Sequence, residues 1–353
     1  LRSRVELAFT NFVGGAGDDR IELLDAAPAS GIKSVVGGSG NDLLVVDDSD
    51  DTSGDTVLVT KSTIDGIGSS AAVDIVFSDV ETLDLTTSSD GDTIHGDFSA
   101  AGGALTAATI RGEGGNDQFT LETTSPGMTV INLFGDAGED TFGTAADPLQ
   151  AGSTLINVDG GSPSAPATPG DTLHFEIGNL AAPLVIDTTS GQIWSDGVLL
   201  TSFNFTEIET FFLYQNGTPF TLPFPIVYGD LFVLGEDNAS DRITFSGVSG
   251  PPGSMQVTIG RQKYGPFNPA PGGKIITFSQ GGNDRVSTAG TFTREMYVDG
   301  GQGNDYLAGG FGNDTLLGRE GRDRLLGAAG DDLIYGGADR DTIDTGDGLN
   351  TAY

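Results

Sequence analysis

A nine-residue period near the C-terminal end constrains the fold of this chain most strongly. Residues 300–344 divide into five tandem units, GGQGNDYLA, GGFGNDTLL, GREGRDRLL, GAAGDDLIY and GGADRDTID. Each unit has Gly first, Asp sixth and an aliphatic residue eighth. In the pattern G-G-x-G-x-D-x-U-x, six residues form a turn and three form a short strand whose U side chain points inward. Two units make one coil of about 18 residues, so the array predicts a stack of parallel strands.

Looser copies of the unit occur upstream, with longer spacing. Residues 14–22 and 37–45 fit the whole pattern, and residues 112–120, 135–143 and 279–287 fit part of it. Their sixth-place aspartates lie 21 to 23 residues apart: Asp19 and Asp42, Asp117 and Asp140, Asp284 and Asp305. Strand-forming runs at 9–13, 108–111 and 274–278 precede these units. We therefore expect coils longer than 18 residues in this part of the chain.

A second internal repeat extends the strand pattern. Residues 77–85 (FSDVETLDL) resemble residues 205–213 (FTEIETFFL), and each copy follows a Gly-Asp-Thr segment. Their period-two alternation indicates strands, and helix signals are nearly absent. The sequence predicts an all-β chain, a parallel β-helix or β-roll solenoid with irregular loop insertions. We expect degenerate coils over 1–144, a continued solenoid with proline- and aromatic-rich insertions over 145–275, and a C-terminal β-roll over 276–353.

The middle of the chain does not follow the repeat period. Residues 176–273 hold most of the prolines, which cannot donate to a sheet ladder and therefore belong in loops, edge strands or strand ends. Residues 162–169 are expected to form a projecting loop. We interpret the aromatic side chains between Phe203 and Phe232 as core packing. Residues 261–268 (RQKYGPFN) are interpreted as an exposed loop that is available for contact.

The turn aspartates carry the chemistry. Stacked turns lie about 4.7 to 4.9 Å apart if their strands pair, and Ca²⁺ takes 6 to 8 oxygens at about 2.3 to 2.6 Å from carboxylates and turn carbonyls. The 18-residue offset pairs Asp305 with Asp323, Asp314 with Asp332, and Asp323 with Asp341. The upstream pairs are three more candidates. The predicted metal ligands are Asp19, Asp42, Asp117, Asp140, Asp284, Asp305, Asp314, Asp323, Asp332 and Asp341.

The five strict units resemble the RTX, or haemolysin-type, calcium-binding nonapeptides of secreted bacterial proteins. The resemblance implies a right-handed parallel β-roll that folds outside the cell when it binds Ca²⁺. Such repeats accompany toxins, proteases, lipases, epimerases and long adhesins. Arg319 and Ala328 depart from the second Gly and Asp339 from the fourth. Arg322 and Arg340 place cations beside the Asp323–Asp341 pair, which makes it the weakest of the three strict sites.

A simpler role for the turn aspartates is open, above all upstream. An Asp in a Gly-rich turn often accepts backbone hydrogen bonds within its own turn and binds no metal.

Charge narrows the set of partners. The chain has 50 acidic and 16 basic residues, a net charge of −34, and 38 of the acids are Asp. Such a polyanion is repelled by nucleic acid and anionic lipid. There is no Cys, so disulfides and thiolate chemistry are excluded. No apolar run is long enough for a membrane-spanning helix. The chain begins with Leu1 and no signal-peptide pattern, which is expected of a mature form or an excised piece.

Enzyme signatures are weak. His95 and His174 are expected to face away from the core, and neither opens an H-E-x-x-H motif. No G-x-S-x-G elbow occurs. A β-helix polysaccharide lyase or epimerase is the enzyme alternative, with basic groups drawn from Arg111, Arg261, Lys263 and Lys274.

We therefore predict a non-enzymatic, calcium-binding, extracellular structural or adhesive module of a bacterial cell surface. Its expected partners are Ca²⁺ and other copies of itself or matrix components. A self-assembling filament or surface-layer subunit is a second alternative.

Overall fold

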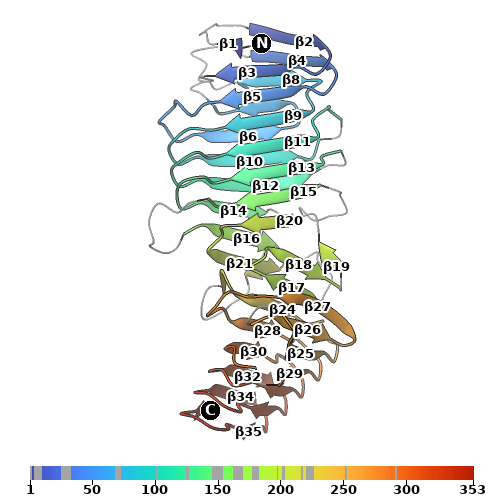
Figure 1. Cartoon of the computed structure of the whole chain (residues 1–353), viewed down its shortest axis with the longest axis vertical. Coiled ribbons are helices and arrows are strands. Elements are labelled where there is room, and N and C mark those ends of the chain that lie inside the picture. Colours follow the sequence, from blue (N-terminus) through green and yellow to red (C-terminus); the bar gives the residue numbers. More distant parts are fainter. Residues whose placement is uncertain are drawn as a thin grey trace. The chain divides into compact units, whose positions relative to one another are not determined.

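The computed structural model is built of strands alone (Figure 1). It describes residues 2–3, 10–24, 33–67, 73–100, 102–124, 127–144, 154–161, 170–176, 183–196, 198–200, 203–215, 218–219, 226–250, 253–290 and 292–353. These residues contain no helix, so none has the length and apolar character that crossing a bilayer requires. The all-β, parallel prediction is confirmed. The projecting loop expected at 162–169 lies outside the described residues.

The chain forms two compact units. Unit 1 comprises Leu1–Asn179 and Thr201–Ile226, and unit 2 comprises Leu180–Leu200 and Val227–Tyr353. The three-segment division expected from the sequence stays a prediction.

Unit 1 has two sheets. Sheet A contains, in spatial order, β1 (Arg2–Ser3), β3 (Arg20–Leu24), β5 (Leu43–Asp47), β9 (Thr82–Thr86), β11 (Ala107–Arg111), β13 (Val130–Phe134), β15 (Leu155–Asp159) and β20 (Phe203–Thr206). Sheet B contains β2 (Thr10–Ala16), β4 (Lys33–Ser39), β8 (Ile75–Ser78), β7 (Thr63–Asp65), β6 (Thr56–Thr60), β10 (Thr93–Phe98), β12 (Gln118–Thr124), β14 (Thr141–Thr144), β16 (Thr172–Glu176), β21 (Thr210–Gln215) and β22 (Thr218–Pro219), and β23 (Ile226–Val227) also pairs with β21. All pairs in sheet A are parallel. From coil to coil along the chain, strands of sheet A therefore alternate with strands of sheet B.

Unit 2 repeats this arrangement, and its coils shorten from 43 to 18 residues toward the C-terminal end. Sheet C contains β19 (Val198–Leu200), β18 (Gln192–Ser195), β17 (Leu184–Asp187), β24 (Leu231–Leu234), β28 (Ile275–Phe278), β30 (Met296–Asp299), β32 (Thr315–Glu320), β34 (Leu333–Ala338) and β36 (Thr351–Ala352). Sheet D contains β27 (Gln262–Phe267), β26 (Met255–Ile259), β25 (Arg242–Gly247), β29 (Arg285–Ala289), β31 (Tyr306–Ala308), β33 (Arg324–Leu326) and β35 (Thr342–Asp344). The strict nonapeptides supply alternate rungs of the two sheets, as their period predicts.

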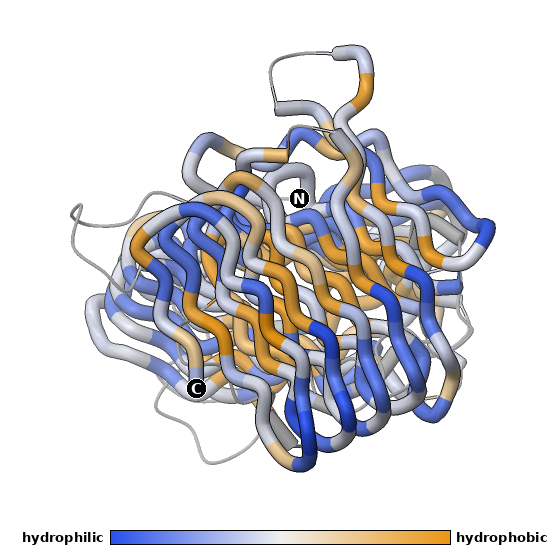
Figure 2. The backbone as a smooth tube through the Cα atoms, turned by 90° about the horizontal axis from the view of Figure 1, so that it is seen from below, coloured by the Kyte–Doolittle hydropathy of each residue, from blue (hydrophilic) through white to orange (hydrophobic). Residues whose placement is uncertain are grey.

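Alternation along each strand builds the core. In sheet A the inward residues of successive coils are in register and almost fully buried: Ile21, Leu44, Leu83, Ala108, Ile131, Ile156 and Phe203. In unit 2 the eighth-place residues Leu307, Leu316, Leu325 and Ile334 are buried in the same way. Figure 2 shows these hydrophobic strand segments in orange and the turns largely in blue. Each coil therefore buries apolar side chains inside the stack and leaves its turns polar.

The repeat array runs one unit further than the sequence pattern indicated. Its end was placed at residue 344, yet Thr351 and Ala352 form a strand that pairs with β34. The Tyr353 ring stacks on Tyr335 with their centroids 4.8 Å apart. Thr345 replaces the first Gly and Asn350 the sixth-place Asp, which concealed this unit.

The interpretation of residues 261–268 as an exposed loop was wrong. Residues Gln262–Phe267 form β27, an edge strand of sheet D, and Tyr264 and Phe267 are fully buried. The polar residues Arg261 and Lys263 stay exposed, so this segment presents polar side chains to solvent and two aromatic side chains to the core. Pro266 is tolerated because the strand lies at the sheet edge.

The aromatic residues of the middle region pack mainly inside, as expected. Phe203, Phe205, Phe211 and Phe232 are buried, whereas Phe212 is 42% exposed. Phe220 and Phe224 lie outside the described residues.

Leu316 and Leu317 give a matched test of this alternation, since Leu316 is fully buried and its neighbour is half-buried. Leu316→Ala should lower the free energy of unfolding by about 2 to 5 kcal/mol, the usual range for a buried Leu. Leu317→Ala should cost about 1 kcal/mol or less. Urea unfolding in millimolar Ca²⁺ measures both. Equal losses would show that the inward face is assigned wrongly.

Candidate metal-binding turns

Buried aspartates link successive turns by a repeated hydrogen bond, in which one turn's backbone N–H donates to the carboxylate of the turn one coil later. In unit 2 the N–H of Asp305 donates to Oδ1 of Asp323 at 2.8 Å, and the N–H of Asp323 donates to Asp341 at 2.9 Å. We call such a series a carboxylate ladder. Because each bond joins two coils, the ladders fix the vertical spacing of the turns.

The described residues contain four carboxylate ladders. Two lie in unit 1: Asp19, Asp42 and Glu81; and Asp55, Asp92, Asp117, Asp140, Asp171 and Glu209. Two lie in unit 2: Asp241, Asp284, Asp305, Asp323 and Asp341; and Asp314, Asp332 and Asn350. All donor–acceptor distances are between 2.6 and 2.9 Å.

The structure brings together all six aspartate pairs that the sequence predicted, including those upstream. The N–H of Asp19 donates to Asp42 at 2.8 Å, and that of Asp117 donates to Asp140 at 2.8 Å. The Asx-turn interpretation requires acceptor bonds within the same turn. Here the Oδ1 bonds run between coils 18 to 43 residues apart in sequence. Metal binding by these residues stays a prediction, and its geometric precondition is met.

The second oxygen of most ladder carboxylates has no hydrogen-bond partner. In the described chain this holds for Oδ2 of Asp19, Asp42, Asp55, Asp92, Asp117, Asp140, Asp171, Asp284, Asp305, Asp323 and Asp332, all of which are buried. Oδ2 of Asp314 and of Asp241 instead accept the N–H of Gly310 and of Glu236. A buried charged oxygen without a partner is costly. A cation bound at these oxygens removes that cost.

Oxygen atoms converge at the first glycine of each turn. A Cβ at Gly300 would lie 2.5 Å from Oδ2 of Asp305 and 3.0 Å from the carbonyl oxygen of Gly318, one coil away. At Gly112 the added carbon would lie 2.0 Å from Oδ2 of Asp117. A carboxylate and a turn carbonyl from neighbouring coils are the hard donors that Ca²⁺ prefers. The residues present therefore fit a calcium ion, and the glycine is required because any side chain would displace these oxygens.

Burial raises the pKa of several ladder carboxyls in the absence of metal. Desolvation raises the pKa of Asp117 to about 8 and that of Asp305 to about 7. It raises the pKa of Asp140 and Asp284 to about 6. Neighbouring carboxylates, such as Asp284 beside Asp305, push in the same direction, and the backbone N–H bonds oppose them. The ladders are thus electrostatically strained when they are ionised without a counter-ion.

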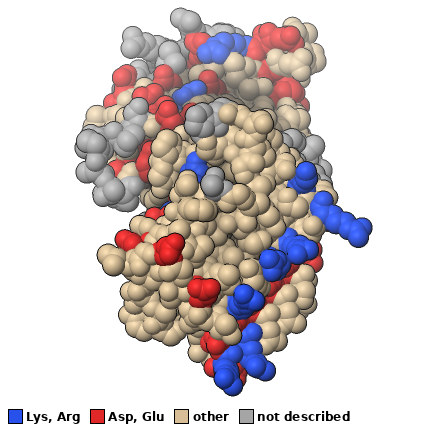
Figure 3. Space-filling view, turned by 60° about the horizontal axis from the view of Figure 1, so that its bottom comes forward, with Lys and Arg blue, Asp and Glu red and all other residues tan. Residues whose placement is uncertain are grey.

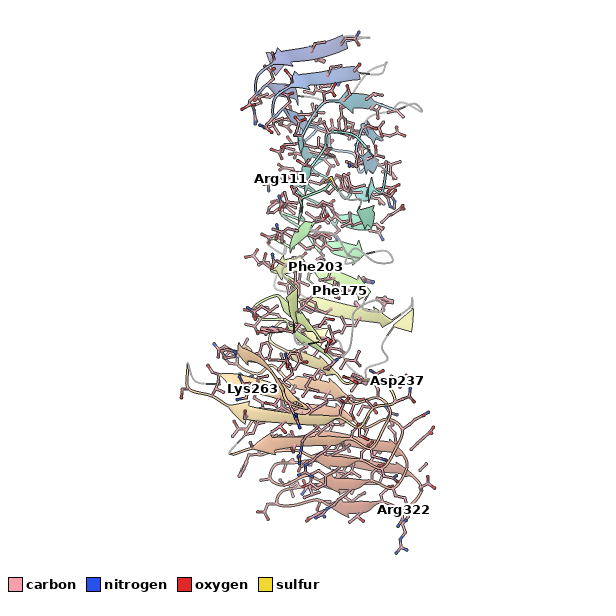
Figure 4. All side chains as sticks on the ribbon, turned by 90° about the vertical axis from the view of Figure 1, so that its right-hand side faces the viewer. Arg111, Phe175, Phe203, Asp237, Lys263 and Arg322 are labelled. Atoms are coloured by element: carbon pink, nitrogen blue, oxygen red, sulfur yellow. The ribbon has the colours of Figure 1, made fainter. Side chains whose placement is uncertain are left out.

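The predicted weakness of the Asp323–Asp341 pair rested on Arg322 and Arg340. Both arginines are exposed, and the backbone N–H of Arg322 donates to Oδ1 of Asn304. Figure 4 shows the Arg322 side chain extending away from the strands. A fifth-place arginine therefore directs its charge outward.

Sequence reasoning missed several ladder members. Asp92, Asp171, Asp55 and Asp241 lack the full glycine pattern, yet three of them stand in a Gly-Asp-Thr segment that starts a strand. Glu81 and Glu209 occupy the sixth-place role in the 77–85 and 205–213 repeat, where a longer side chain reaches the N–H of Asp42 and of Asp171. The Asp-Thr or Glu-Thr pair before a strand was the available signal.

The two histidines occupy outward strand positions, as expected. Ile94 and Leu173, which precede them, are buried. Nδ1 of His174 lies 3.1 Å from the hydroxyl of Tyr214.

The basic groups considered for a lyase have local partners or separate locations. Arg111 stacks on Phe134, Lys274 pairs with Glu295, and Lys263 is exposed on β27.

Comparison with known families agrees with this geometry. A family model described as the RTX calcium-binding nonapeptide repeat (4 copies) matches residues 34–52, 297–316 and 317–352. A search of curated proteins found no match to the chain. The matched segments include the turns of Asp42, Asp305 and Asp323. The chain carries RTX repeats, which are structural and bind Ca²⁺. The match through residue 352 agrees with the additional C-terminal unit.

Stability should depend on pH in opposite directions with and without calcium. Without Ca²⁺, folded carboxyls with pKa values of about 6 to 8 hold protons that the unfolded chain, with pKa near 3.9, has lost. The free energy of unfolding should therefore fall as pH rises from about 5 to 8. With Ca²⁺ it should rise over the same range, because the ligands must be deprotonated. In EDTA the far-UV β signal, followed from about pH 5, where these carboxyls are protonated, to about pH 8, measures the first, and urea unfolding in millimolar Ca²⁺ measures the second. The same direction in both media would contradict the metal assignment.

The effect of Asp305→Asn on stability should have opposite signs with and without calcium. The amide keeps an Oδ1 acceptor for Asp284 but removes a buried charge, so the metal-free fold should become more stable. With Ca²⁺ the variant should lose at least about tenfold in affinity, or about 1.4 kcal/mol. Asp347→Asn, at an exposed turn position of the same array, is the control. It should neither stabilise the metal-free fold nor weaken the binding of Ca²⁺. A loss of stability in EDTA would indicate a purely structural aspartate.

Proposed function

We propose that this chain, which carries RTX calcium-binding nonapeptide repeats, is a calcium-dependent structural or adhesive module that works outside the cell. The proposal rests on the carboxylate ladders, whose buried Oδ2 atoms lack partners in both units. Binding free energy at such sites is folding free energy, because the unfolded chain does not hold the oxygens together. Calcium therefore takes the role that disulfides have in other secreted proteins, and this chain has no Cys.

The affinity that is usual for extracellular calcium modules fits a location outside the cell. Extracellular calcium modules bind at about 10⁻⁴ to 10⁻³ M, a concentration that cells maintain outside but not in the cytosol. A ladder of carboxylates that repel one another until calcium arrives would keep the chain unfolded inside the cell. RTX repeat proteins are typically secreted. The proposed role is non-enzymatic: the ladders serve folding, and among the described residues Arg111, Lys263 and Lys274 lie in separate surroundings.

The adhesive part of the proposal is supported by a column of arginines on sheet D. On neighbouring strands, Arg242 is in register with Arg285, and Arg285 is in register with Tyr306. Tyr306 is in register with Arg324 on the next strand. The Arg285 guanidinium lies 3.8 Å from the centroid of the Tyr306 ring, and that of Arg324 lies 5.7 Å from it. Figure 3 shows Lys and Arg gathered in a band along one side of the lower part of the view.

Such a column fits an anionic polysaccharide of the cell surface or matrix. Guanidinium groups form bidentate bonds to carboxylates and sulfates, and stacking on Tyr306 holds two of them in place. The rest of the chain is acidic, but its charges are screened beyond about 8 Å at physiological salt. Contact at the column is therefore compatible with a net charge of −34.

Calcium titration tests the structural part of the proposal. The far-UV β signal of the full chain should appear at about 10⁻⁴ to 10⁻³ M Ca²⁺ and disappear with EDTA. Mg²⁺ at the same concentration is the control and should restore far less. A spectrum that is unchanged by either ion would overturn calcium-dependent folding.

Binding to hyaluronate, with neutral dextran as the control ligand, tests the adhesive part. In millimolar Ca²⁺ and 0.15 M salt, substituting Arg242, Arg285 and Arg324 by Gln should weaken binding at least about tenfold. A variant with Arg20 and Arg111 changed to Gln loses two exposed or half-exposed arginines of unit 1 and should bind as the unchanged chain does. Equal loss in both variants would show that only net charge matters.

A further inference from the structure

Three aspartates, of which Asp48 and Asp51 are not ladder members and Asp55 begins a ladder, converge in the connection between β5 and β6. Asp48, Asp51 and Asp55 each offer a carboxylate oxygen, and the three oxygens lie within 4.8 Å of one another. Two ligands of one calcium ion can be at most about 4.6 to 5.2 Å apart, twice the ligand distance of about 2.3 to 2.6 Å. One ion can therefore contact all three carboxylates.

Buried oxygens without partners point into this cluster. Asp48 is 1% exposed, and its Oδ2 has no hydrogen-bond partner. Oδ2 of Asp55 is also buried without a partner. Oδ1 of Asp51 accepts the backbone N–H and the hydroxyl of Ser53, which fixes the orientation of its carboxylate. A nearly fully buried carboxylate with an unbonded oxygen among other carboxylates is costly when it is ionised, and a bound cation removes that cost.

The strand register shows that Asp48 occupies the place of a first glycine. Asp47, Thr86, Arg111 and Phe134 are in register, so Asp48 is equivalent to Thr87, Gly112 and Gly135 in the following coils. At Gly112 and Gly135 a Cβ would lie 2.0 and 2.2 Å from the carboxylate of the same turn. At this first-glycine position, Asp48 carries a complete carboxylate side chain.

A two-residue insertion makes this substitution possible. Seven positions separate Asp48 from the ladder residue Asp55, whereas five separate Gly112 from Asp117. The longer turn holds Asp51, whose N–H donates to the carbonyl of Asp48 at 2.9 Å. The insertion thus replaces a compact glycine turn with a wider one that contains three acidic side chains.

The surrounding charges do not neutralise the cluster. Asp48 interacts electrostatically with one lysine, Lys33, and with three aspartates, Asp51, Asp55 and Asp92. One cation against four carboxylates leaves an excess of negative charge in a partly buried place. A divalent ion reverses the sign of that interaction.

We propose that Asp48, Asp51 and Asp55 form a divalent-cation site of the calcium class that differs from the glycine turns of the repeats and shares the ladder residue Asp55. Three carboxylate oxygens leave further coordination positions to water, as Ca²⁺ with 6 to 8 ligands allows. The ion closes the 48–55 turn over the entry to β6. Repeat turns can therefore acquire a different site by insertion, at a coil where the glycine pattern is lost.

Hydrogen exchange and metal counting on the full chain test this site locally. With Ca²⁺, peptides covering residues 44–58 should become protected in the unchanged chain and stay unprotected when Asp48 and Asp51 are both changed to Asn. Bound Ca²⁺ after equilibrium dialysis should fall by about one ion per chain. Asp51→Asn alone, in a half-buried position, disturbs folding least and should weaken this site at least about tenfold.

The controls separate this site from the repeat sites. Asp50→Asn removes an exposed charge from the same turn and should leave both readouts unchanged. Asp305→Asn should alter protection at 300–344 and not at 44–58. If the 44–58 segment responds equally to Ca²⁺ in the Asp48/Asp51 variant, or if no ion is lost, the proposed site is wrong even where the repeats bind calcium.

Discussion

Buried carboxylates with one bonded and one unbonded oxygen are the constraint on which the rest of this structure depends. Oδ1 of a ladder aspartate such as Asp305 or Asp323 accepts an N–H from the neighbouring coil, so the carboxylate cannot turn to solvent without breaking the contact between coils. In most ladder aspartates Oδ2 is then held in the protein without a partner. Because this electrostatic cost recurs in both units, we expect the stability of the stack to depend on a cation as well as on its apolar core.

Other features follow from this arrangement. The first glycine of a turn is fixed because Oδ2 occupies the space of its side chain, as at Gly112 and Gly300. A glycine in the left-handed region, such as Gly303 with φ of 131°, brings its turn against the carbonyl of Gly282 in the preceding coil. Insertions are tolerated where the ladder contact survives. Coils of 18 to 43 residues therefore share one set of turn contacts.

Much of this was predictable from sequence because the decisive signals are periodic. The spacing of Asp305, Asp323 and Asp341 defined the coil, and the alternation of Leu316 with its neighbours defined the inner face. Contacts set by register alone were not predictable. Glu81 replaces an aspartate at a distance that only strand pairing reveals, and Asn350 continues the array after the glycine pattern has faded. Residues 261–268 resembled a loop because a run of exposed polar residues precedes buried Tyr264, and Phe267 follows three positions later, without the alternation that marks a strand.

The Asp48 cluster shows the same limit. Its three aspartates stand in a run rich in Asp and Ser that resembles an ordinary solvated loop, and only the register with Gly112 reveals that one of them is buried at a glycine position. Local composition therefore indicates metal chemistry, whereas the neighbouring coils determine where a carboxylate is confined.

Anomalous diffraction from crystals of the full chain grown in millimolar Ca²⁺ tests the central claim most directly. The account predicts calcium peaks within about 2.3 to 2.6 Å of ladder Oδ2 atoms, including those of Asp305 and Asp323. Oδ2 atoms that contact only protons or water in such crystals, with the coils intact, would contradict it.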